Sequence, residues 1–183
     1  GVTNVNVVAA GSKHSCLWAG EHTHCFGRPG DHQLFNGNAY TDPNHNTQWI
    51  DFELEDLIAG GLASCLKRGS EGSGSAGWLC MGRPSNIHLF SQLQRVGEAE
   101  EATNVLITQS HYCVTTPLGA YCAGDNSSGA ISDDPSNPSQ LTPIGVEPGL
   151  RLALGNQVTC YITADERVRC RGDYQSGRLG RGG

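Results

Sequence analysis

The sequence predicts an all-β fold made of four repeats of about 48 residues. Three observations lead to this prediction: a recurring pair of cysteines, a glycine two residues after each pair, and an aliphatic residue nine residues after each pair. The first cysteines are Cys16, Cys65, Cys113 and Cys160, separated by 49, 48 and 47 residues. The second cysteines are Cys25, Cys80, Cys122 and Cys170. Self-similarity at such a period is typical of repeat architectures.

Each repeat supplies about four short strands. In the first repeat, residues 5–10 are β-branched and apolar, as expected for an entry strand, and residues 15–19 and 23–26 form a hairpin that carries both cysteines. Residues 49–54 alternate between apolar and acidic side chains, which predicts a half-buried connecting strand. Four antiparallel strands per repeat, arranged radially, predict a β-propeller-like array of four blades. We expect one domain whose repeats cover 1–56, 57–104, 105–150 and 151–183.

The cysteines are expected to form one disulfide inside each blade. The two cysteines of a repeat face each other across the predicted hairpin, and the tight Cys-x2-Cys spacing of a zinc site is absent. The expected pairs are Cys16–Cys25, Cys65–Cys80, Cys113–Cys122 and Cys160–Cys170. A complete set of paired cysteines indicates an oxidising compartment, so we expect a secreted, extracellular or cell-surface protein, consistent with a removed secretory signal before Gly1.

Composition argues against several function classes. The net charge is −6, with two lysines and no lysine-rich tract, which disfavours nucleic-acid binding. No run approaches the ~20 apolar residues needed for membrane insertion. There is no nucleophile elbow, phosphate loop or unpaired cysteine, so we expect no enzyme activity, no catalytic residue and no cofactor. His22 and His24 share one face of a hairpin and offer a metal site as the alternative, but a surface cluster is the simpler interpretation and we expect no metal.

Three segments carry a family resemblance. VVAAGSKHSCLW…HCFG, LALGNQVTCYI…VRCRGDYQSGRLG and YCAGDNSSGAI resemble the repeat of the regulator-of-chromosome-condensation superfamily, whose secreted members carry a similar cysteine pair. The resemblance implies a propeller of four-stranded blades that binds macromolecular partners with its loops. It implies no particular partner, because members include nucleotide-exchange factors, β-lactamase inhibitors and surface proteins.

The chain departs from that family in repeat number. Members commonly have seven repeats, and this chain has four. We expect the fourth repeat to lack a connecting strand after the polar loop that ends at Gly183. An unfilled strand position leaves backbone edges open, which another chain can complete.

Two groups of charges are candidates for contacts between molecules. Alternation along the last predicted strand places Arg167, Arg169 and Arg171 on one face, with Arg178 nearby, while Asp51, Glu53 and Glu55 lie near the first connecting strand. Opposite charges at the two ends suggest head-to-tail pairing between molecules, and an ordinary solvated strand face is the alternative.

Asn126 lies in the single sequon for N-glycosylation, Asn126-Ser127-Ser128. The sequon falls in the GDNSSG loop of the third repeat, where we expect room for a glycan. The protein is then a candidate glycoprotein.

The sequence thus predicts a non-catalytic extracellular protein that acts in macromolecular binding or assembly through blade loops and open strand edges. The expected partner is a protein, either another copy or a different chain, or a glycan. The candidate loops are residues 28–47, 69–77 and 132–143. One alternative is a structural subunit that forms an oligomer or filament, with residues 1–10 of a neighbour or a blade edge completing the last blade. A second alternative is a secreted enzyme inhibitor or a lectin-like glycan binder.

Overall fold

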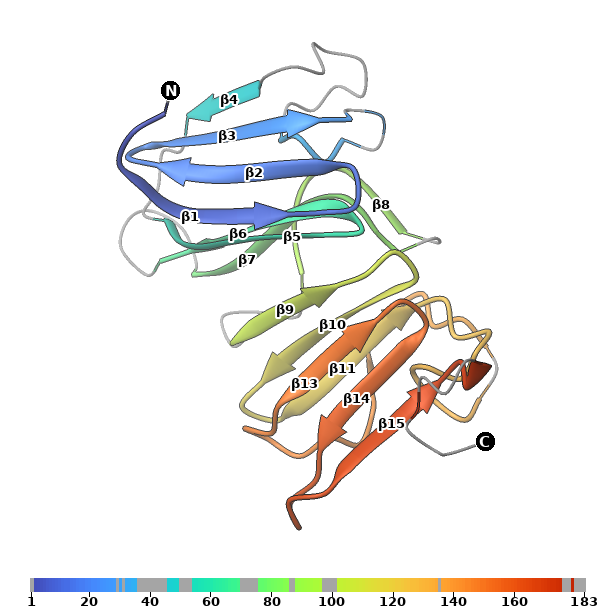
Figure 1. Ribbon diagram of the computed structural model, residues 1–183. Helices are drawn as coiled ribbons and strands as arrows, with labels where there is room; N and C mark the ends of the chain where they lie inside the picture. The colour runs from blue at the N-terminus through green and yellow to red at the C-terminus, as the bar shows by residue number, and fades with distance from the viewer. Residues whose placement is uncertain are drawn as a thin grey trace.

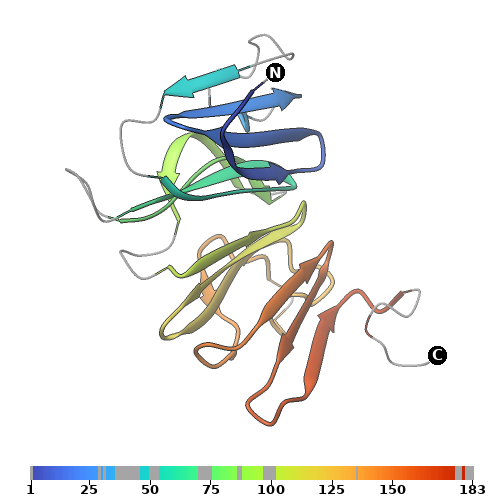
Figure 2. The same ribbon diagram turned by 60° about the vertical axis from the view of Figure 1, so that its left-hand side comes forward.

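The described strands of the computed structural model form four antiparallel sheets, or blades, that follow one another along the chain (Figures 1 and 2). The structure describes residues 2–28, 30, 32–35, 46–49, 54–69, 76–85, 88–96, 102–134, 136–175 and 179. Neither view shows the first blade in contact with the fourth, so the array is open.

The first three blades have four strands each and the described part of the fourth has three. The first blade contains β1 (Val5–Ala10), β2 (His14–Ala19), β3 (His22–Gly27) and β4 (Asn46–Trp49). The second contains β5 (Leu54–Gly60), β6 (Leu62–Arg68), β7 (Gly77–Ser85) and β8 (His88–Arg95). The third contains β9 (Asn104–Ile107), β10 (His111–Thr116), β11 (Gly119–Gly124) and β12 (Thr142–Pro143). The fourth contains β13 (Leu152–Gly155), β14 (Val158–Ile162) and β15 (Val168–Gly172).

The all-β class and the four-blade array are confirmed, but one strand is displaced. The expected connecting strand at 49–54 is wrong in position, because β4 pairs with β3 over 46–49 and Leu54 already begins β5. Leu54 is buried at 4% exposure beneath the first blade. Leu54 is therefore apolar because it belongs to the second blade, where its side chain packs against the first blade. Two expected repeat boundaries, after residues 56 and 104, fall inside β5 and β9.

The cysteines are direct cross-strand partners in the hairpin of each blade. Cys16 pairs with Cys25 in the β2–β3 register, and the other three pairs occupy the same position in their own hairpins. All four expected disulfides are present, with Cα–Cα separations from 4.0 to 4.2 Å. One bond in each hairpin therefore fixes the register of the two middle strands.

The glycine two residues after each second cysteine has a structural reason. Gly27, Gly82, Gly124 and Gly172 have φ between 106° and 130°, a conformation that side chains rarely adopt. At Gly172, a Cβ atom would lie 2.1 Å from the carbonyl oxygen of Gln157, in the turn before β14. The last residue of the hairpin must therefore be glycine for the backbones to approach closely.

Each of the first three disulfides is buried under the blade that follows. The covering residues are a cross-strand pair from the first two strands of that blade, which we call its front pair: Leu57–Leu66, Val105–Val114 and Leu152–Tyr161. These pairs pack on Cys16–Cys25, Cys65–Cys80 and Cys113–Cys122, respectively. The six covered cysteines are at most 1% exposed. The core is thus divided among the three junctions between blades.

The first strands of the blades also contact one another. β1 lies against β5, β5 against β9, and β9 against β13. The entry strands therefore form the inner side of the array, and the later strands of each blade extend outward (Figure 1).

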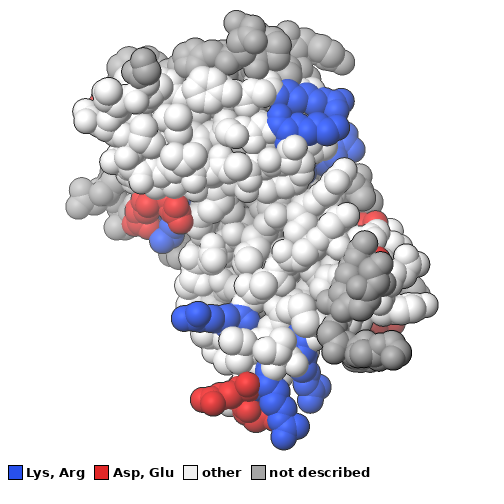
Figure 3. All heavy atoms as spheres, in the orientation of Figure 1, with Lys and Arg blue, Asp and Glu red and all other residues white. Residues whose placement is uncertain are grey.

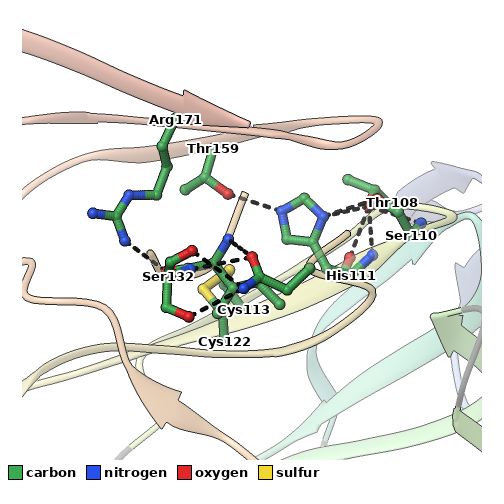
Figure 4. The surroundings of a disulfide bond; sticks show 10 residues. Thr108, Ser110, His111, Cys113, Cys122, Ser132, Thr159 and Arg171 are labelled. Atoms are coloured by element: carbon green, nitrogen blue, oxygen red, sulfur yellow. Dashed lines mark hydrogen bonds between the residues drawn. A yellow bond between two sulfur atoms is a disulfide. The ribbon is translucent and has the colours of Figure 1, made fainter. Parts of the chain in front are cut away.

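Two of the three junctions contain a buried histidine that bonds to a hydroxyl of the next blade. His14 Nε2 lies 2.8 Å from Ser64 Oγ, and Ser64 donates its own proton to the carbonyl of Gln33. His111 Nε2 lies 2.8 Å from Thr159 Oγ1, and Figure 4 shows its ring between Thr159 and the Thr108 and Ser110 side chains. Because Ser64 has a single proton to donate, His14 donates from Nε2.

Burial keeps both histidines neutral. Desolvation lowers the pKa of His14 to about 4 and that of His111 to about 4. Their ordinary pKa is about 6.5, so the unfolded chain binds more protons than the folded chain between these values. The free energy of unfolding is therefore complete above pH 6.5 and decreases as the pH falls toward 4.

We expect acid to destabilise the fold through these two residues, by roughly 3 kcal/mol for each histidine once the pH is below both pKa values. Urea unfolding measured from pH 8 to pH 4 will reveal this loss as a falling midpoint. His14→Gln and His111→Gln, whose amides retain a donor for the facing hydroxyl, should each flatten the dependence by about half. A double variant with the wild-type pH dependence would contradict the assignment.

Candidate interaction surface

The first blade carries a front pair that the described residues cover incompletely, since Val8 is exposed and Leu17 is half-buried. Val8 pairs with Leu17 across β1 and β2, at the positions of Leu57–Leu66 in the second blade. Val8 is 70% exposed, whereas Leu57 and Leu66 are 2% and 3% exposed. On the opposite side of β1, Val7 and Ala9 pack toward the second blade. β1 therefore has one packed side and one open apolar side.

The fourth blade carries a disulfide that the described residues cover incompletely. Cys160 and Cys170 are half-buried, unlike the six cysteines inside the junctions. Val168 lies two residues before Cys170 on the same side of β15 and is 70% exposed. One shallow groove of about 470 Å³ adjoins this disulfide, and its lining includes Ala153, Val158 and Cys160. A second groove, of about 520 Å³, reaches Val168 but is lined mainly by residues on the side that faces the third blade: Asp133, Tyr161, Arg169 and Arg171.

These two surfaces are the opposite halves of a blade junction. In each internal junction, a front pair covers the disulfide of the preceding blade. Among the described residues, the first blade has such a front pair with no disulfide beneath it, and the fourth blade has such a disulfide with no front pair over it. We call them the Val8 face and the Cys160–Cys170 face. In the view of Figure 3, the surface over β1 and β2 is mainly uncharged. An apolar side chain follows every first cysteine in the sequence, and this signal would have identified the front pairs.

The arginines expected to share one face have different environments. Arg171 donates from Nη1 to the carbonyl oxygen of Ile131 at 2.7 Å, toward the third blade (Figure 4). Arg167 precedes β15 and pairs with Asp165 at 3.1 Å in a largely exposed turn. Arg169 is exposed on β15. Arg169 and Arg171 stand two residues apart on β15 and so lie on the same side of the strand, as expected, but Arg171 also holds the loop of the third blade. Arg178 lies outside the described residues.

The acidic group is only partly described. Glu55 pairs with Lys67 of the adjacent strand, with Oε2 and Nζ 2.7 Å apart. Asp51 and Glu53 lie outside the described residues. The described structure thus gives Glu55 an ion-pair partner within its own blade.

Asn126 organises the loop of the third blade. Its side chain is 0% exposed, and its Oδ1 accepts hydrogen bonds from the backbone amides of Ile131 and Ser132. Its Nδ2 donates to the hydroxyl and carbonyl of Ser132 and to the carbonyl of Asp134. A glycan on Nδ2 would remove these bonds, so the expectation of room for a glycan at Asn126 is wrong for the folded chain.

The described histidines offer no catalytic or metal-binding arrangement. His14 and His111 are buried in junctions, and His22 and His24 stack on β3 with ring centroids 6.0 Å apart. Within the ranges that the structure describes, no three His, Cys, Asp or Glu side chains gather into a metal site. Ser110 Oγ lies 2.9 Å from His111 Nδ1, but both residues are at most 1% exposed inside a junction. That contact is out of reach of a substrate. Nor does any helix in the described chain have the length and apolarity of a membrane span.

Replacing Asn126 should disrupt this loop. In Asn126→Ala, the amides of Ile131 and Ser132 lose their acceptor, and we expect a loss of roughly 3 kcal/mol in the free energy of unfolding. Ser128→Ala is the matched control, because it also destroys the sequon but leaves the Asn126 side chain in place. Equal stability of the two variants would contradict the role of Asn126. In secreted wild-type protein, peptide mass mapping should find Asn126 unmodified.

The fourth disulfide should be reduced before the others. Reduction requires a thiolate to reach a sulfur atom, and only Cys160–Cys170 is incompletely covered among the four. Brief treatment with dithiothreitol under native conditions, followed by alkylation and mass mapping, should label Cys160 and Cys170 first. Equal labelling of all eight cysteines would mean that the blades separate before reduction.

Comparison with known proteins reveals similarity in structure. No protein-family model matches the sequence, and no curated protein matches it significantly. Human WBSCR16 superposes with a TM-score of 0.70 at 15% identity, covering 93% of this chain and 50% of that one. Yeast RCC1 (Prp20), solved with Kap60, gives 0.72 at 13% identity, covering 96% and 45%. The CRINKLY WD40 ectodomain of the Arabidopsis thaliana receptor kinase ACR4 gives 0.55 at 18%, covering 90% and 51%.

The chain spans about half the length of the solved structures that it matches. At these identities the similarity concerns the fold, and it agrees with the four-blade array described above. The chain therefore has the RCC1-like β-propeller fold, and its described strands form four blades.

Proposed function

We propose that this chain is a non-catalytic extracellular module that binds protein partners through the exposed faces of its outer blades. The observation that carries the proposal is the Val8 face. Val8 is 70% exposed at a position whose equivalents in the next two blades, Leu57 and Val105, are 2% and 3% exposed. A blade face with this composition is suited to contact with another protein surface.

The chemistry of the face favours a protein over a glycan. Val8 and Leu17 offer aliphatic surface, and Val5 adds a side chain that is 41% exposed on the same strand. A contiguous apolar patch on a blade face is characteristic of protein contacts. Sugars need convergent hydrogen-bonding groups, which aliphatic side chains do not provide.

The faces have more support than the loops as binding sites. Most of the loops at 28–47 and 69–77 lies outside the described residues. The loop at 132–143 is held against the third blade by two hydrogen bonds. Asn137 Oδ1 accepts one from the backbone N–H of Asn126 at 2.7 Å, and the carbonyl oxygen of Pro138 accepts one from the backbone N–H of Gly124 at 3.1 Å. A loop fastened in this way has less freedom to adapt to a partner.

The proposed compartment follows from the cysteines and has support from one neighbour. Four disulfides and no free cysteine suit an oxidising environment. The similar domain of ACR4 is the ectodomain of a receptor kinase. The similar yeast protein Prp20 was solved bound to Kap60 and studied for binding to Gsp1p and histones. Protein binding is thus a use to which this fold is put.

The test is retention of partner proteins by the immobilised chain. Extracellular proteins of the source organism are passed over wild type, Val8→Asp and Leu118→Asp. Leu118 is the matched control because it is 72% exposed in the turn between β10 and β11, away from the Val8 face. We expect wild type and Leu118→Asp to retain the same proteins, and Val8→Asp to retain at least about tenfold less because a carboxylate would have to be desolvated. Equal retention by all three would refute the proposal.

A further inference from the structure

We propose that the Val8 face of one copy of this chain docks on the Cys160–Cys170 face of a second copy. The inference rests on the proposed function, because it identifies the protein partner of the same surfaces. It extends the blade junction, which occurs three times inside the chain, to a contact between chains.

The first argument is the equivalence of positions. In each internal junction, a front pair from one blade covers the disulfide of the blade before it. The chain also has a front pair, Val8–Leu17, and a disulfide, Cys160–Cys170, that are both incompletely covered. Among the described residues, one copy thus carries both halves of a further junction.

The second argument is the chemistry around the two faces. The junction between the second and third blades lacks the histidine of the others, because Ala63 stands where His14 and His111 stand in their blades. Val158 occupies this position in the fourth blade. A contact between the fourth blade and a neighbour's first blade would therefore resemble the junction between the second and third blades, which is apolar at this position. It would leave no buried imidazole without a hydrogen-bond partner.

The third argument is the space available. The groove beside the fourth disulfide has a volume of about 470 Å³, and its lining includes Ala153, Val158 and Cys160. Front-pair side chains fill the corresponding space in the internal junctions.

This arrangement differs from completion of the last blade by residues 1–10 of a neighbour. β1 is already hydrogen-bonded to β2 within its own blade. A strand exchange would have to break that pairing, whereas face-to-back docking leaves every described strand in its sheet. The contact is heterologous, since different surfaces of the two copies meet.

The experiment measures mass in solution by sedimentation velocity over a wide concentration range. We expect the wild-type chain and Leu118→Asp to associate. Val8→Asp changes only the Val8 face and Val168→Asp changes only the Cys160–Cys170 face, and each variant alone should associate at least about tenfold more weakly than wild type. A mixture of the two variants contains one intact Val8 face and one intact Cys160–Cys170 face, so it should form a one-to-one dimer.

The complementation separates docking from loss of fold, because two unfolded variants cannot restore an association. A second readout is the rate of Cys160–Cys170 reduction, which should fall with protein concentration in wild type and stay constant in Val8→Asp. A monomeric wild-type chain would overturn the inference. Association of the Val168→Asp variant by itself would also overturn the inference, because it would mean that two Val8 faces pair with each other. If the wild-type chain is monomeric but still retains a different protein through Val8, the proposed function stands and this inference fails.

Discussion

The contact between a disulfide and the front pair of the next blade is the interaction on which the array depends. A single blade is a thin sheet with two faces and cannot bury either face alone. The cross-link makes one face compact and apolar, and aliphatic side chains such as Leu57 and Leu66 cover it from the next blade. Burial of each such side chain contributes about 1.5 to 3 kcal/mol. The free energy of unfolding therefore comes from burial at the junctions, and an uncovered face contributes nothing to it.

The polar residues in the junctions add specificity to this apolar contact. His14 and His111 each reach a hydroxyl group about 50 residues further along the chain, with separations of 50 and 48 residues. A buried hydrogen bond of this kind is satisfied in one relative position of the blades, and an unsatisfied imidazole would be costly. The aliphatic pairs hold neighbouring blades together, and the histidines fix how they are aligned.

Much of the fold could be predicted from the sequence because the repeat places cysteine and glycine at fixed positions. The register of the hairpins and the disulfide pairs follow from Cys16–Cys25 and its equivalents. The fourth strand of the first blade was misplaced because the alternation around residues 49–54 has two causes: β4 ends at Trp49 and β5 begins at Leu54. Local pattern does not separate strands that lie in different sheets.

The candidate interaction surface was harder to predict, because it depends on which apolar residues remain uncovered in the folded chain. Nothing local distinguishes Val8 from Leu57 or Val105, which are buried in equivalent positions. The sequon at Asn126 was misleading for a similar reason. Asn126 binds backbone groups of its own loop and Arg171 binds a carbonyl of the third blade, and such contacts leave no trace in spacing.

The distribution of the histidines gives the array an order of opening. The junctions on either side of the central pair of blades contain His14 and His111, whereas the central junction has Ala63 at that position and the buried aromatic ring of Tyr112 on the other side. A proton thus has a point of attack at both outer junctions, whereas the equivalent position of the central junction holds an alanine. In weak acid we therefore expect the second and third blades to be the most persistent part of the fold, with amide hydrogens at the two ends of the array exchanging before those of β6 and β10.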